Sequence, residues 1–345
     1  MEILWLCLTA FLIAGYVVLD GYDLGAGIVH LAVARSDQER RQVLQSIGPL
    51  WDGNEVWLVA AGGTLFFAFP VLYASAFSGF YLPLMMVLWL LIFRGISIEF
   101  RSHVTGPVWR PFWDVIFAII SIVLTFVFGA ALGNVIRGAP LDPSSHFFLP
   151  LWTDFGVSPP VGILDWYTVL VGALSFFALM QHGALWVAMR TNEPVAGRAR
   201  RIQSYSWVGV AVLTAAVTSA TWRVQPLVPA NLSKYSWGYV FPALALVALA
   251  GIPLFRARGS DRGAFCASTL YLAGMLASAT FGIFPYVMPS NGDPRNGLTI
   301  YNSVAGAYGL QVGLSWWLPG MALAVFYTIF VHLKFSGKVD TSLPH

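Results

Sequence analysis

The chain has 345 residues, of which 57% are hydrophobic and only 10% are charged, whereas soluble domains contain about 25% charged residues. Its formal net charge is +3 and its mean hydropathy is +0.71. This composition excludes a soluble globular enzyme, a disordered protein and a nucleic-acid-binding protein, and indicates an integral membrane protein. Cys7 and Cys266 both lie in long apolar runs, which excludes a disulfide framework and a thiolate metal site.

Nine apolar runs are long enough to cross a bilayer, which requires about 20 residues. They lie near residues 3–33, 56–75, 77–98, 112–136, 164–189, 205–222, 237–255, 264–288 and 312–334. We therefore expect an all-α polytopic membrane protein, with a single integral membrane domain over residues 1–345. The connection around 137–163 has room for one short surface element.

A faint internal similarity suggests how the helices are grouped. Leu19-Asp20-Gly21 in the first run resembles Gln181-His182-Gly183 in the fifth. This similarity favours a first four-helix bundle over residues 1–136, a second over 164–288, and a ninth helix over 312–334. Three pairs of glycines are expected to serve helix packing. They are Gly21 and Gly25, Gly62 and Gly63, and Gly129 and Gly133.

The basic residues predict the orientation of these nine helices. All but four of the 19 lysines and arginines fall on one side if the runs cross alternately. The four exceptions are Arg137, Arg223, Lys234 and Arg295. Because cytoplasmic loops carry an excess of Lys and Arg, the N-terminus is expected outside and the C-terminus in the cytoplasm.

Two pairs of carboxyl groups stand out in the first two spans. Asp20 and Asp23 are three residues apart and so share a helical face, and Asp52 and Glu55 repeat that spacing at the start of the second span. Ionisable side chains in a membrane are costly and usually face the bundle interior or a water-filled path. Two interpretations remain open: ion pairs or helix caps, and a hydrated relay that takes up protons from the cytoplasm.

Other polar residues at the same side have simpler explanations. Glu99 and Asp114 are expected to pair with arginines, of which Arg94, Arg101 and Arg110 are nearest in sequence, or to cap helices. His30 could accept protons or hydrogen-bond at the membrane interface.

His182 lies deep in the fifth span. It could bind haem, but a lone imidazole on an apolar helix more commonly makes a contact between helices. No pair of His or Met residues has a placement that indicates a haem in this chain.

Several segments resemble one known family. Gly48–Leu58 (GPLWDGNEVWL) and Asp20–Gly25 (DGYDLG) are similar to subunit II of the cytochrome bd-type quinol oxidases. Further similar stretches cover residues 62–70, 77–83, 94–101, 284–290 and 298–302. The resemblance extends over almost the whole chain and is most specific over residues 20–101.

This resemblance implies a subunit of a respiratory terminal oxidase in the bacterial inner membrane. The complex would oxidise quinol and reduce O2 to water, taking protons from the cytoplasm. A larger subunit I would bind two b-type haems and one d-type haem. The present chain would be the haem-free companion, inactive alone, with a small accessory subunit as a further candidate partner. In some members a structural quinone also lies within subunit II.

The resemblance also assigns roles to residues of the motif. Asp52 would take part in proton uptake, with Glu55, Asp23 and Asp20 as neighbours on the path. Trp51, Gly53 and Asn54 would lie where the two large subunits meet, and Trp57 near a route for oxygen. No residue of this chain is expected to be catalytic by itself or to bind a metal.

A proton- or cation-coupled transporter is the alternative function. Intramembrane acids fit that class too, but many transporters show repeats whose broken helices meet near the membrane midplane. Here the acids gather at one side of the membrane, which favours the oxidase subunit.

Overall fold

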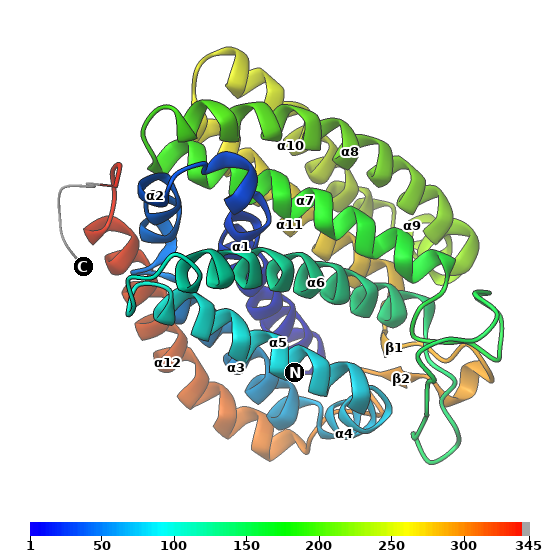
Figure 1. Ribbon diagram of the computed structural model, residues 1–345. Coiled ribbons are helices and arrows are strands. Elements are labelled where there is room, and N and C mark those ends of the chain that lie inside the picture. Colours follow the sequence, from blue (N-terminus) through cyan, green and yellow to red (C-terminus); the bar gives the residue numbers. More distant parts are fainter. Residues whose placement is uncertain (340–345) are drawn as a thin grey trace.

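The computed structural model describes residues 1–339, so the last six residues of the expected domain lie outside the described part. Long helices run side by side through the molecule (Figure 1). The α-helices are α1 (Glu2–Val33), α2 (Asp37–Ile47), α3 (Trp51–Ala68), α4 (Pro70–Gly79), α5 (Tyr81–Phe100), α6 (Trp109–Arg137), α7 (Trp166–Arg190), α8 (Val195–Val224), α9 (Leu227–Lys234), α10 (Val240–Ala257), α11 (Asp261–Ile283) and α12 (Ala307–Lys334). Two 3₁₀ turns, η1 (Ser236–Tyr239) and η2 (Pro294–Asn296), and two short antiparallel strands, β1 (Tyr286–Met288) and β2 (Leu298–Thr299), complete the fold.

The described helices bear out a polytopic membrane protein. Eight of them are long and apolar enough to cross a bilayer. The pair α3 and α4 passes the same test only when taken together, and its two axes differ in direction by 119°. Counting this pair as one span raises the number to nine in residues 1–339, as the hydropathy of the sequence predicts.

The second span differs from its prediction. The continuous run expected over 56–75 is broken at Phe69, and Pro70 begins α4. Proline has no backbone N–H to continue the preceding hydrogen-bond ladder, whereas the first position of a new helix needs none. Helix α3 begins at Trp51, before the predicted start at residue 56. The hydropathy pattern missed this first turn because Asp52 and Glu55 lower its mean hydropathy, although they do not prevent helix formation. The acidic motif therefore forms the first turn of a helix about 27 Å long.

Helix α2 was not predicted, since charged residues dominate its sequence. A capping box starts it: the Ser36 hydroxyl accepts from the Glu39 N–H, and the Glu39 carboxylate accepts from the Ser36 N–H. Partial burial tends to raise the pKa of Glu39, but hydrogen bonds from Arg198 and the Arg35 N–H outweigh it and lower that pKa. The Trp186 indole also donates to Ser46 O at 3.1 Å, which ties α2 to α7.

Helix α7 forms the centre of the described structure and packs against α1, α6, α8 and α11. Its closest approach is to α1, where a Cβ atom at Gly25 would overlap the Leu179 carbonyl oxygen and the Gly183 backbone. The packing role predicted for Gly25 is thus confirmed, and Gly129 meets α7 in the same way. For Gly62 and Gly63 the packing role stays a prediction, because an added Cβ at either position meets no atom of the described residues within 4 Å.

A buried ion pair that the sequence did not predict joins the end of α6 to the start of α7. Arg137, at the end of α6, pairs with Asp165, and both side chains are buried. Asp165 also caps α7, accepting from the N–H groups of Tyr167 and Thr168 at 2.8 Å each. The segment between these helices, which has room for a short surface element, contains no helix or strand among the described residues.

Substituting Gly25 with valine should destabilise the protein by about 1–3 kcal/mol, because overpacking forces α1 and α7 apart. Thermal unfolding in detergent would measure this as a lower Tm. Gly62→Val is the matched control, since its side chain meets open space on α3. An equal Tm for the two variants would contradict the packing described here.

Candidate functional site

Two carboxyl groups contact one buried guanidinium group, and a third carboxyl group follows on the same helix. Arg94 of α5 is completely buried, and its Nη1 donates to Asp20 Oδ2 at 2.7 Å while its Nη2 pairs with Asp20 Oδ1. Glu55 Oε1 lies 3.4 Å from the same Nη1. Asp23, also fully buried, follows Asp20 by three residues on α1. We call Asp20, Asp23, Glu55 and Arg94 the carboxylate cluster.

Asn54 connects α3 to the carboxylate cluster. Its Nδ2 donates to Asp23 Oδ2 and to the Tyr22 hydroxyl, each at 2.7 Å. Asp23 Oδ1 has no hydrogen-bond partner among the described residues. A buried carboxyl oxygen without a partner is energetically costly, so this atom is a position from which a proton or a further polar contact could be exchanged.

Asp52 lies apart from the carboxylate cluster. Its side chain is exposed on the outer side of α3 and makes no hydrogen bond or ion pair within the described residues. Glu55 lies between the buried carboxylate cluster and the exposed face of α3, since 25% of its side chain is exposed and one of its oxygens lies near Arg94. The structure therefore groups three of the four predicted carboxyl residues and leaves Asp52 on the surface of this chain.

The remaining motif residues make contacts within the chain. The Trp51 ring lies against Gly95 of α5. Trp57 is buried, and its indole N–H donates to Thr328 Oγ1 of α12 at 3.4 Å. Gly53 lies beside Tyr327, also of α12.

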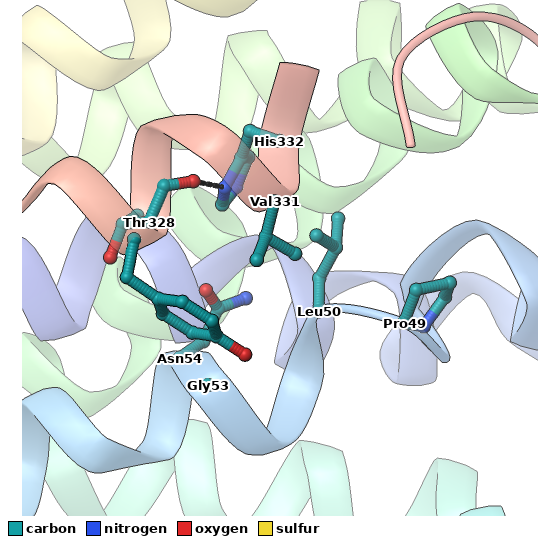
Figure 2. A pocket seen from close by; sticks show the side chains of 8 residues that line it. Pro49, Leu50, Gly53, Asn54, Thr328, Val331 and His332 are labelled. Carbon is teal, nitrogen blue, oxygen red and sulfur yellow. Dashed lines mark hydrogen bonds between the residues drawn. The ribbon is translucent and has the colours of Figure 1, made fainter. Parts of the chain in front are cut away.

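A small cavity separates the first turn of α3 from the last turns of α12 (Figure 2). Its volume of about 20 Å³ is sufficient for one water molecule. The lining residues are Pro49, Leu50, Gly53, Asn54, Tyr327, Thr328, Val331 and His332. Pro49 and Tyr327 are exposed whereas Leu50 and Asn54 are buried, so the cavity connects the surface with the side of Asn54.

The hydrogen bonds beside this cavity have a defined direction. An amide nitrogen can only donate, so the Tyr22 oxygen accepts from Asn54. The Tyr22 hydroxyl then donates to His332 Nε2 at 2.9 Å. His332 Nδ1 donates to Thr328 O at 2.8 Å, the bond drawn as a dashed line in Figure 2. Tyr22 also stacks on Trp186 at 4.0 Å. Sequence reasoning missed Tyr22 and His332, since neither their spacing nor their type distinguished them.

A second polar group lies near the α5–α6 junction. His30 Nε2 lies 2.7 Å from Asp114 Oδ1, and Arg101 Nε donates to the same oxygen at 2.6 Å. The predicted pairing of Asp114 with an arginine is confirmed. His30 makes a hydrogen bond, one of the two roles expected for it, while the proton-accepting role stays a prediction. Glu99 is exposed and has no ion pair in the described part, so its predicted pairing is wrong within this chain.

His182 has partners at both ring nitrogens. Nδ1 lies 3.0 Å from Ser268 Oγ and Nε2 lies 3.0 Å from Val18 O, while Phe265 stacks on the ring. These bonds join α7 to α11 and α1, as expected for a contact between helices. Neither nitrogen is free to coordinate an iron.

Comparison with known proteins decides the family. The sequence profile described as "Cytochrome bd terminal oxidase subunit II" matches residues 1–335. The chain belongs to this family. It is thus a subunit of a cytochrome bd oxidase, an oxidoreductase complex of the bacterial inner membrane. The alternative of a proton- or cation-coupled transporter is therefore rejected.

Individual relatives and one solved structure agree with this assignment. The chain is 30% identical to the probable cytochrome oxidase subunit 2 of Haemophilus influenzae, with 99% of this chain and 96% of the relative covered. It is 29% identical to the cytochrome bd-I ubiquinol oxidase subunit 2 of Escherichia coli K12, covering 98% and 95%. It is 30% identical to the cytochrome bd ubiquinol oxidase subunit 2 of Bacillus subtilis, covering 90% and 88%. The bd oxidase structure from Geobacillus thermodenitrificans shares the fold, with a TM-score of 0.74, 17% identity, and 96% and 98% covered.

Arg94→Gln should strongly destabilise the protein, because it leaves Asp20 buried without its cation, a change that costs about 3–5 kcal/mol. Thermal unfolding and the yield of folded protein would report the loss. Adding Asp20→Asn to Arg94→Gln should recover much of it, since the buried charge is then removed.

Arg258→Gln is the control, because Arg258 is exposed and forms no ion pair in the described residues. If Arg94→Gln unfolded at the same temperature as this control, the pair would have no structural importance.

Proposed function

We propose that this chain is the haem-free subunit II of a bd-type oxidase and conducts protons from the cytoplasm toward a haem-bearing subunit I. That subunit would bind two b-type haems and one d-type haem, where quinol is oxidised and O2 is reduced to water. The present chain would have no oxidase activity alone. The observation that carries this proposal is the carboxylate cluster, in which Asp20 and Glu55 contact the buried guanidinium of Arg94 and Asp23 is buried three residues along α1.

The distribution of basic residues supports the proposed orientation. Arg40, Arg101 and Arg110 lie at the end of the molecule where α2 contacts the α5–α6 junction. The excess of Lys and Arg at that end supports a cytoplasmic location, with the N-terminus outside. We propose two four-helix bundles, one of α1, α3, α5 and α6 and one of α7, α8, α10 and α11, which meet where α7 packs on α1 and α6, with α12 as the ninth helix.

The proposed path comprises Asp52, Glu55, Asp23 and Asp20. Arg94 can neutralise only one of the three clustered carboxyl groups, so the others are suited to hold and release protons. Asn54 holds Asp23 in place, and Glu55 links the cluster to the exposed face of α3. Protons drawn through these groups from the cytoplasm, with quinol protons released outside, would separate charge across the membrane.

The outer face of α3 is the proposed contact with subunit I. Exposed Asp52 and partly exposed Glu55 would be costly against lipid, which favours a protein surface over them. Trp51, Gly53 and Asn54 would support this face from within, through their contacts with α5, α12 and α1. The apolar packing of Trp57 beside Leu12 and Tyr16 suits passage of oxygen.

Asp52→Asn should lower O2-reduction turnover of the assembled complex roughly tenfold or more, since a proton-transferring group is removed. Oxygen consumption with saturating quinol would measure turnover, and the visible spectrum would confirm unchanged haem content. Glu99→Gln is the matched control, as Glu99 is also an exposed acid without an ion pair in the described residues. Unaltered turnover of Asp52→Asn, with the haem spectrum intact, would remove Asp52 from the path.

A further inference from the structure

Four arginines surround two aspartates where α2 meets the junction of α5 and α6. The arginines are Arg40, Arg41, Arg101 and Arg110, and the aspartates are Asp37 and Asp114. We call these six residues the arginine cluster. It lies at the ends of two membrane-spanning helices, apart from the carboxylate cluster.

Asp37 is contacted by three guanidinium groups at once. Its carboxylate lies 2.8 Å from Arg101, 2.9 Å from Arg110 and 3.7 Å from Arg41, although 46% of the Asp37 side chain is exposed. One half-exposed carboxylate cannot neutralise three cations. The surface around Asp37 therefore retains positive charge.

Asp114, on the buried side of the arginine cluster, does not neutralise the remaining positive charge either. It accepts from Arg101 at 2.6 Å and lies 3.2 Å from Arg40, and its remaining contact is His30 at 2.7 Å. Even with a neutral His30, four guanidinium groups face two carboxylates, which leaves a surplus of two positive charges. Glu39 does not reduce it, because that carboxylate pairs with Arg198 at 2.6 Å.

Several guanidinium nitrogens of the cluster have no acceptor. Arg101 Nη1, Arg40 Nε and Arg110 Nε are buried N–H groups without a hydrogen-bond partner in the described residues, although buried donors are normally satisfied. Arginine presents its donors in a planar fork that matches phosphate oxygens. The unmet donors and the surplus charge both favour an anion.

Exposed apolar side chains adjoin the arginine cluster. Val108 and Phe112 flank Arg110 on the first turn of α6, and Val104 lies in the preceding loop; the exposed fraction of Val108 is 77%. A free phosphate ion would gain nothing from these side chains. A phospholipid could place acyl chains against them while its phosphate meets the guanidinium groups.

We propose that the arginine cluster binds the phosphate headgroup of an anionic phospholipid from the adjoining leaflet. Anionic lipids attract basic residues at the membrane surface, and basic pockets between spanning helices bind their headgroups. Arg41 and Arg110, the arginines at the exposed Asp37, would make the first contact. The site is independent of the proposed proton path, so either proposal can fail without the other.

The test is lipid retention by the purified oxidase complex. The complex is reconstituted in phosphatidylcholine discs containing phosphatidylglycerol, and bound lipid is counted by native mass spectrometry. Each arginine removed should weaken phosphatidylglycerol binding about fivefold, so Arg41→Gln and the Arg41→Gln/Arg110→Gln double variant should show stepwise losses. Arg258→Gln, at an exposed arginine between α10 and α11, should retain the wild-type value.

Two results would overturn the proposal. One is equal phosphatidylglycerol retention by the wild type and Arg41→Gln. This single variant loses only the ion pair between Arg41 and Asp37, so it should fold even if the double variant does not. The other is an increase in Tm with inorganic phosphate in pure phosphatidylcholine discs that matches the increase with phosphatidylglycerol. That outcome would identify a site for free phosphate instead of a lipid.

Discussion

The bidentate pair between Arg94 and Asp20 is the interaction on which the carboxylate cluster depends. Both side chains are fully buried, and a charge is tolerated inside a membrane protein only when its partner is in place. The pair joins α5 to α1 and creates a strongly polar position inside the helices, beside which Glu55 and Asp23 lie. Without Arg94, three carboxyl groups would face one another with no cation.

The surrounding helices keep that polar position in place. Helix α7 approaches α1 at Gly25 and Gly183 so closely that backbones touch, and His182 adds a hydrogen bond to Val18 O from the same helix. On the opposite side, Asn54 and Tyr22 connect α1 to α3 and α12. The same region combines rigid packing with a row of polar atoms, a suitable arrangement for holding proton-carrying groups at fixed positions.

The sequence predicted the type of fold and that Asp20 and Asp23 share a helical face, but not the contacts of these residues. Hydropathy identified nine apolar runs, and a spacing of three residues placed Asp20 and Asp23 on one face, because both signals are local. The partner Arg94 is separated from Asp20 by 74 positions, so only the packing of α5 could reveal it. The outward direction of Asp52 depends on how α3 is rotated against α1, which no local pattern determines.

The most direct test of the central claim is infrared difference spectroscopy of the complex as it is reduced and reoxidised. If the carboxylate cluster takes up protons during turnover, a band from a protonated carboxyl group should change with redox state. Asp23→Asn should abolish that change, while Glu99→Gln should preserve it. An identical difference band in Asp23→Asn, Asp20→Asn and Glu55→Gln would contradict the account, because the cluster would then play no part in proton uptake.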